Sequence, residues 1–242
     1  MKKAVRICVS AGLAVTLLAG GVQASALSAR QAVLSPATVT EENCISGDWK
    51  RADSPELTAK IKKLFEKAFD GLEGASYTPV ALLATKTTTS GTQYRVLCKM
   101  TLCVPDAEEE YVVVTLGRNW LGKAELLDIG DAVAPTNLPT EADREADPLA
   151  GGWSETESPV MTDEAKAAFQ KATEGFVGVD YTPVALLSTQ VVAGTNYRIL
   201  CEATVVYPGA EMHYVVMTIY EDLQGNASIL SISDSVASET AE

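Results

Sequence analysis

The chain contains an internal repeat, and this feature constrains its fold more than any other. The heptapeptide YTPVALL occupies residues 77–83 and recurs at residues 181–187, about 100 residues further along, which indicates two copies of one structural unit. Other matches at nearly the same spacing are Trp49 with Trp153, Phe65 with Phe169, Gly71 with Gly175, Tyr94 with Tyr197, Cys98 with Cys201, and Tyr111 with Tyr214. A chain of 242 residues has room for two domains of about 100 residues each.

The repeat defines the domain boundaries that we predict. Copy one covers residues 44–131 and copy two covers residues 149–236. The intervening residues 132–148 are rich in Pro, Thr, Ala, Asp and Glu without an apolar period, which predicts an acidic, flexible linker. Residues 27–43 are predicted to be a leader, and residues 237–242 a tail.

Each copy is predicted to begin with one helix. Ser54 is the expected cap in copy one, with Pro55 in the first helical position, and Thr162 is the expected cap in copy two. Apolar residues follow each cap at helical spacing. The strands predicted after the helices are 78–86, 93–104, 110–118 and 124–130 in copy one, and 182–190, 196–207, 213–221 and 227–233 in copy two. This order predicts an α+β fold in which one helix packs across a four-stranded antiparallel sheet in each copy.

The N-terminus has the pattern of a secretory signal peptide. The basic residues at the start are Lys2, Lys3 and Arg6. An apolar run at residues 7–19 follows, and residues 22–24 or 24–26 supply the small residues of a cleavage site. The apolar run is shorter than the roughly 20 residues of a spanning helix. We therefore expect residues 1–26 to be removed, no membrane insertion after cleavage, and a secreted or extracytoplasmic protein.

Charge and residue content exclude several classes of function. The net charge of −13 repels nucleic acid and anionic membranes, so no nucleic-acid partner is expected. We also predict a monomer. His213 is the only histidine and forms no Cys–His or Ser–His pair within the chain. The sequence also lacks a glycine-rich phosphate loop. The prediction is a protein that is not an enzyme and needs no metal or cofactor.

The cysteines divide into two kinds. Cys98 and Cys201 occupy equivalent positions in the two copies and are predicted to be small core residues. Cys44 and Cys103 occur only in copy one. Because an exported chain can form disulfides, a bridge between Cys44 and Cys103 is a possible link between the leader and the sheet.

One hairpin of copy two carries a resemblance to a known family. Residues 189–197 read TQVVAGTNY, and the pentapeptide from Gln190 to Gly194 fits the pattern Q-x-V-x-G. This run resembles the first binding hairpin of the cystatins, which inhibit papain-like cysteine proteases. It falls between the first two predicted strands after the helix, where that family places it. The resemblance implies two tandem cystatin-like domains, of which the second carries the binding site.

The resemblance also implies which residues bind. In cystatins an N-terminal segment and two hairpin loops form a wedge that fills the protease cleft without a covalent bond. The corresponding residues here are Gln190, Val191, Val192, Ala193 and Gly194 in the first loop, Gly151 and Gly152 in the preceding segment, and Leu223 in the second loop. Burial of each tip valine in a cleft would contribute roughly 1.5–3 kcal/mol. The alternative is that the same residues form only a structural hairpin.

Two departures from the cystatin pattern concern the loops. Residues 221–226 lack the Pro-Trp pair that many cystatins carry in the second loop. In copy one the first tip, residues 86–91, is polar, although Trp120 lies in its second loop. Copy one is therefore predicted to be degenerate. The predicted function is a secreted, reversible inhibitor that occludes the active-site cleft of a papain-like cysteine protease. The alternative is a non-inhibitory secreted or cell-surface protein-binding module with a cystatin-like fold.

Overall fold

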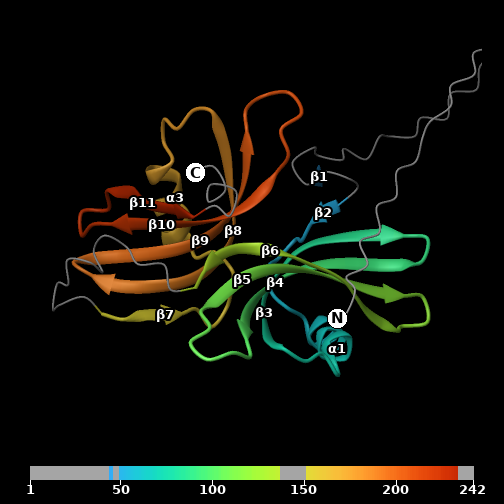
Figure 1. Ribbon diagram of the computed structural model, residues 1–242. Coiled ribbons are helices and arrows are strands. Elements are labelled where there is room, and N and C mark those ends of the chain that lie inside the picture. Colours follow the sequence, from blue (N-terminus) through green and yellow to red (C-terminus); the bar gives the residue numbers. More distant parts are fainter. Residues whose placement is uncertain (1–43, 46–48, 137–150, 234–242) are drawn as a thin grey trace, which may run out of the picture. The chain divides into compact units, whose positions relative to one another are not determined.

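A computed structural model describes residues 44–45, 49–136 and 151–233 (Figure 1). These residues all belong to one compact unit that spans Thr40–Glu242. The predicted signal peptide, leader and tail, and most of the predicted linker, lie outside the described residues.

Copy one forms a six-stranded antiparallel sheet with strand order β1-β2-β3-β4-β5-β6. Its elements are β1 (Cys44–Ile45), β2 (Trp49–Arg51), α1 (Ala59–Phe69), β3 (Ala75–Thr88), β4 (Gly91–Leu102), β5 (Glu109–Asn119) and β6 (Ala124–Pro135). The last strand continues to Pro135, so it includes residues that were predicted to belong to the linker.

Copy two forms a five-stranded antiparallel sheet with strand order β11-β10-β9-β8-β7. Its elements are β7 (Trp153–Glu155), α3 (Asp163–Ala172), β8 (Val179–Val192), β9 (Gly194–Val205), β10 (His213–Glu221) and β11 (Ala227–Ser233). The helix and the four long strands follow the same order as in copy one (Figure 1).

The predicted fold class is wrong. Neither sheet has four strands, and the described structure is mostly β rather than a balanced α+β fold. The extra strands lie before each helix, where β2 pairs with the edge of β3 and β7 pairs with the edge of β8. A strand of three residues is too short to show the alternating pattern by which longer strands are recognised. These short strands, and the two-residue strand β1 that pairs with β2, were therefore missed.

The helix starts show why one predicted cap is correct and the other is wrong. Thr162 caps α3 as predicted, and its hydroxyl accepts a hydrogen bond from the Ala165 amide at 3.2 Å. Helix α1 is capped by Thr58 instead of Ser54. The chain before Thr58 still follows the sheet, since the Pro55 carbonyl accepts a hydrogen bond from the Leu82 amide at 2.8 Å.

Each sheet is buried on both faces. One face packs against the helix of its own copy: Phe65 of α1 shares a buried cluster with Val96 and Val114, and α3 has a similar cluster in copy two. The other faces of the two sheets share a third cluster, which joins Leu83 and Leu97 of copy one to Leu187 and Leu200 of copy two, among others. Burial on both faces explains the uninterrupted apolar run in YTPVALL.

Candidate functional site

The hairpin between β8 and β9 carries the residues of the cystatin-like motif. Val192 pairs with Gly194 across the hairpin, which leaves Ala193 at the tip. Val191 is 70% exposed, Ala193 is also exposed, and Val192 is half-buried. The hairpin therefore presents one fully protruding valine and a second valine that is partly covered.

Gly194 has a structural role that only glycine can fill. Its φ of 131° lies in the range that favours glycine. A Cβ atom at this position would overlap the carbonyl oxygen of Glu221, at the end of β10. Gly91 occupies the equivalent corner of copy one, where a Cβ would overlap the carbonyl oxygen of Arg118. The absence of a side chain lets the second hairpin lie directly against the first.

Gln190 joins the hairpin to the segment before β7. Its side chain is buried, and its Nε2 donates a hydrogen bond to the Gly151 carbonyl oxygen at 2.9 Å. Its Oε1 accepts a hydrogen bond from Asn196 Nδ2 at 2.8 Å. The Gly151 amide in turn donates to the Val191 carbonyl oxygen at 2.9 Å. These contacts hold the chain at Gly151 against the hairpin. Gly152 follows and is exposed, and a Cβ added there would meet nothing within 4 Å.

Two tyrosines join the first hairpin to the end of β10. The Tyr220 hydroxyl donates a hydrogen bond to the Ala193 carbonyl oxygen at 2.7 Å. The Tyr197 hydroxyl donates to Glu221 Oε2 at 3.1 Å. Burial, together with the hydrogen bond to the Glu221 carboxylate, raises the pKa of Tyr197 to about 12. The tip is therefore supported by its neighbouring strand.

The loop between β10 and β11 is organised by Asp222. One oxygen of this carboxylate accepts hydrogen bonds from the amides of Gln224 and Asn226, at 2.9 and 2.8 Å, and the other accepts from the Asn226 side chain at 2.8 Å. The hydrogen bonds from Asn226 lower the pKa of Asp222. This turn leaves Leu223 78% exposed. A fixed loop thus presents one apolar side chain to solvent.

The structure brings all the predicted binding residues of copy two to one end of its sheet. The pairs Trp153 with Gln190, Thr195 with Glu221 and Glu221 with Ala227 place the three segments beside one another at that end. The roles of Tyr220 and Glu221 were not predicted from the sequence. The only signal for these roles was that both residues carry polar groups at the end of β10, which is mostly apolar.

The equivalent end of copy one differs in where its apolar surface lies. Its β3–β4 hairpin closes with Thr88 opposite Gly91, and the tip is polar as predicted. Trp120 and Leu121, in the β5–β6 loop, are 80% and 73% exposed. Copy one thus exposes apolar side chains only in the second of the two loops.

The cysteines of the two copies lie in different environments. Cys98 and Cys201 are completely buried, as predicted, and burial raises the pKa of both thiols. Cys103 has a free, exposed thiol, whereas the side chain of Cys44 lies outside the described residues. Side-chain contacts therefore do not test the proposed bridge between them.

The strand register argues against that bridge. Cys44 pairs with Lys50, and Lys50 pairs with Thr85 near the hairpin end of β3. Cys103 follows the opposite end of β4, where its amide donates to the Gly74 carbonyl. At about 3.3 Å per residue these positions lie roughly 30 Å apart along the strands, whereas bridged Cα atoms lie within about 7 Å of each other.

Two further findings concern only the part of the chain that the structure describes. It contains no group of three or more His, Cys, Asp or Glu residues that could hold a metal ion. Within the same residues, no helix combines the length and the apolar character needed to cross a bilayer.

Comparisons with known proteins give little additional information. No family model matches the chain, and no curated protein matches it. Among solved structures, the crystal structure of mouse fetuin-B aligns with a TM-score of 0.26 and 11% sequence identity, over 75% of this chain and 70% of that chain. At so low a TM-score and identity, this likeness identifies neither a fold nor a function for the chain.

Proposed function

We propose that copy two is a reversible inhibitor of papain-like cysteine proteases that occludes the active-site cleft and performs no catalysis itself. One observation carries this proposal: Val191 and Leu223 protrude from adjacent loops at the same end of a sheet, next to the chain at Gly151. The N-terminal signal-like segment supports a role outside the cytoplasm. The resemblance of residues 190–194 to the cystatin hairpin supports the class of target.

The chemistry required of such an inhibitor is burial of apolar surface by a pre-organised tip. Burying Val191 in a cleft would contribute roughly 1.5–3 kcal/mol, and Leu223 a similar amount. The hydrogen bonds of Gln190 and Tyr220 fix the tip before binding. Because less conformational freedom is then lost on association, more of this free energy is retained as affinity.

The experiment is a titration of papain with the full chain, in which cleavage of a small fluorogenic peptide measures the remaining protease activity. The proposal predicts inhibition that is competitive with substrate, reversed by dilution, and accompanied by no cleavage of residues 189–197. Absence of inhibition at micromolar protein, or steady cleavage of the hairpin, would contradict it. Native mass spectrometry of the mixture gives the stoichiometry, which we expect to be one protease per chain.

One observation favours the second candidate, a non-inhibitory protein-binding module. Trp120 occupies the position in copy one that corresponds to Leu223, and it is 80% exposed. Exposed tryptophan is characteristic of residues that anchor protein–protein interfaces. If papain is not inhibited, and Trp120→Ala abolishes binding of the chain to a purified secreted protein, the second candidate replaces the first.

A further inference from the structure

The interface between the two copies has the contact pattern of a twofold-symmetric dimer. The buried cluster between the sheets contains both members of several equivalent pairs: Val80 and Val184, Ala81 and Ala185, Leu83 and Leu187, Leu97 and Leu200, Tyr111 and Tyr214, and Val113 and Val216. In an isologous interface each partner contributes the same patch, so a contact from one position to another is matched by its reciprocal. The two copies thus meet through the same face.

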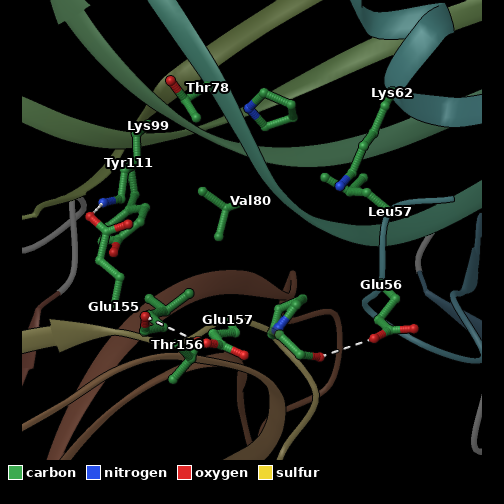
Figure 2. A pocket seen from close by; sticks show the side chains of 14 residues that line it. Glu56, Leu57, Lys62, Thr78, Val80, Lys99, Tyr111, Glu155, Thr156 and Glu157 are labelled. Carbon is green, nitrogen blue, oxygen red and sulfur yellow. Dashed lines mark hydrogen bonds and ion pairs between the residues drawn. The ribbon is translucent and has the colours of Figure 1, made fainter. Parts of the chain in front are cut away.

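Two ion pairs cross this interface at reciprocal positions. Arg51 of copy one contacts Glu202 of copy two, and Glu155 of copy two contacts Lys99 of copy one. The alignment of the repeats makes Arg51 equivalent to Glu155, and Lys99 equivalent to Glu202. Figure 2 shows Glu155 beside Lys99 and Tyr111 at the edge of a cavity of about 360 Å³ between the copies.

Both ion pairs have reversed charges at equivalent positions. Copy one carries a cation at each of the two positions, and copy two carries an anion at each of them. A contact between two copies of repeat two would bring Glu155 to Glu202, and a contact between two copies of repeat one would bring Arg51 to Lys99. Like charges in such contacts are costly, particularly at Glu202 and Lys99, whose side chains are only 5% and 12% exposed.

The neighbours of these pairs differ between the copies. Glu109 lies 3.5 Å from Lys99 and gives it a second anion within copy one. Met212 stands at the equivalent position of copy two, where it packs against the cluster of Trp49. Arg95 and Arg198, which are equivalent residues, act electrostatically on Tyr214 and Tyr111 at the two crossings, so each copy supplies one further cation that does not distinguish the repeats.

We propose that the crossed ion pairs make each interface face selective for the unlike repeat, so that copy one takes copy two as its partner and like repeats reject one another. The apolar residues, which are nearly the same in both faces, supply attraction without discrimination. The four charged residues supply the discrimination. The partner of the copy-one face is thus the acidic face of copy two.

The test uses full-length charge variants. The acidic variant, Arg51→Glu with Lys99→Glu, gives copy one the charges of copy two. The basic variant, Glu155→Arg with Glu202→Lys, does the reverse. Each variant alone has like charges at both crossings, and we expect its thermal midpoint to fall by about 5 °C or more. A matched control, Lys50→Glu with Lys123→Glu, makes the acidic variant's charge change at side chains that are 62% and 72% exposed, and it should retain the wild-type midpoint.

Two further measurements decide the proposal. A chain with all four interface substitutions restores both pairs with exchanged signs, so its midpoint should rise above those of both twofold variants. It should stay below the wild-type value, because the new carboxylate at position 99 lies beside Glu109. An equimolar mixture of the acidic and basic variants should form a 1:1 heterodimer by size-exclusion chromatography with light scattering, whereas each variant alone should not dimerise. The proposal is overturned if the fourfold variant is no more stable than the twofold variants, or if the mixture stays monomeric while both variants remain folded by circular dichroism.

Discussion

The side chain of Gln190 reaches the backbone of Gly151, to whose carbonyl oxygen it donates a hydrogen bond at 2.9 Å. Since its other amide atom accepts from Asn196, both ends of this buried side chain are used. The bond links the first hairpin to the segment before β7. This contact holds two of the three projecting segments together.

Replacing Gln190 by Ala should lower the unfolding free energy of the protein. The change leaves the Asn196 amide without its acceptor in a buried position and costs about 1–3 kcal/mol of unfolding free energy. Urea denaturation measures this loss. The matched control is Gln170→Ala, at an exposed position on α3, which should change stability by less than about 0.5 kcal/mol. Equal effects of the two changes on unfolding free energy would show that the hydrogen bonds of the Gln190 side chain do not stabilise the fold.

Gly194→Ala should destabilise the protein because the new Cβ overlaps the Glu221 carbonyl and φ is 131°. A backbone forced into this region costs about 1–3 kcal/mol, and relief of the overlap adds to it. Gly152→Ala is the control, since nothing lies within 4 Å of its added Cβ. Thermal unfolding should separate the two variants clearly, and a Gly194→Ala protein with the wild-type midpoint would contradict the described packing of β10 against the tip.

The Tyr197–Glu221 contact predicts that the Tyr197 phenol ionises at a higher pH than an ordinary tyrosine. The folded pKa of Tyr197 is raised to about 12, so the neutral phenol is the favoured form. Its contribution to stability is complete below the ordinary pKa of 10.0 and is lost as the pH rises towards 12. Ultraviolet absorbance of the phenolate, with Tyr197→Phe to assign the signal, should place this step near pH 12. Glu221→Gln should move it to lower pH, and an unchanged step would exclude the contact.

The Asp222 turn predicts a loss of order in acid. Hydrogen bonds from Asn226 lower the pKa of this carboxyl below its ordinary value of 3.8. The stability that they contribute is present above that value and is lost as the pH falls through the lowered pKa. Carboxyl chemical shifts from NMR should show a depressed Asp222 titration in the wild type and a higher one in Asn226→Ala. Identical titrations in both proteins would show that the turn does not form in solution.

The sequence predicted the long strands and one helix cap because each depended on local patterns. Thr162 precedes a clear apolar stripe, and the long strands are long apolar segments bounded by turn residues. The start of α1 was misplaced since the hydrogen bond from Leu82 to Pro55, which keeps the chain extended, is formed with a residue distant in sequence. Local propensity does not report such contacts. The short strands β1, β2 and β7 were missed because two or three residues are too few to show a pattern.

The site shows a similar division. The motif predicted the hairpin and its exposed Val191, whereas the partial burial of Val192 depends on tertiary packing at the tip. The support from Tyr220 comes from a strand that lies beyond the hairpin in sequence. The burial of a second face on each sheet could have been predicted from the sequence, because an uninterrupted run such as Val-Ala-Leu-Leu indicates burial on both sides.

The most direct measurement of the central claim compares papain inhibition by the wild type, Val191→Asp and Leu121→Asp, all as full chains. Val191 and Leu121 are 70% and 73% exposed, so both changes should leave unfolding free energy within about 0.5 kcal/mol of the wild type. Occlusion by the copy-two hairpin predicts that Val191→Asp raises the inhibition constant at least about tenfold, a loss of about 1.4 kcal/mol, while Leu121→Asp leaves it unchanged. Equal inhibition by all three proteins would contradict the account.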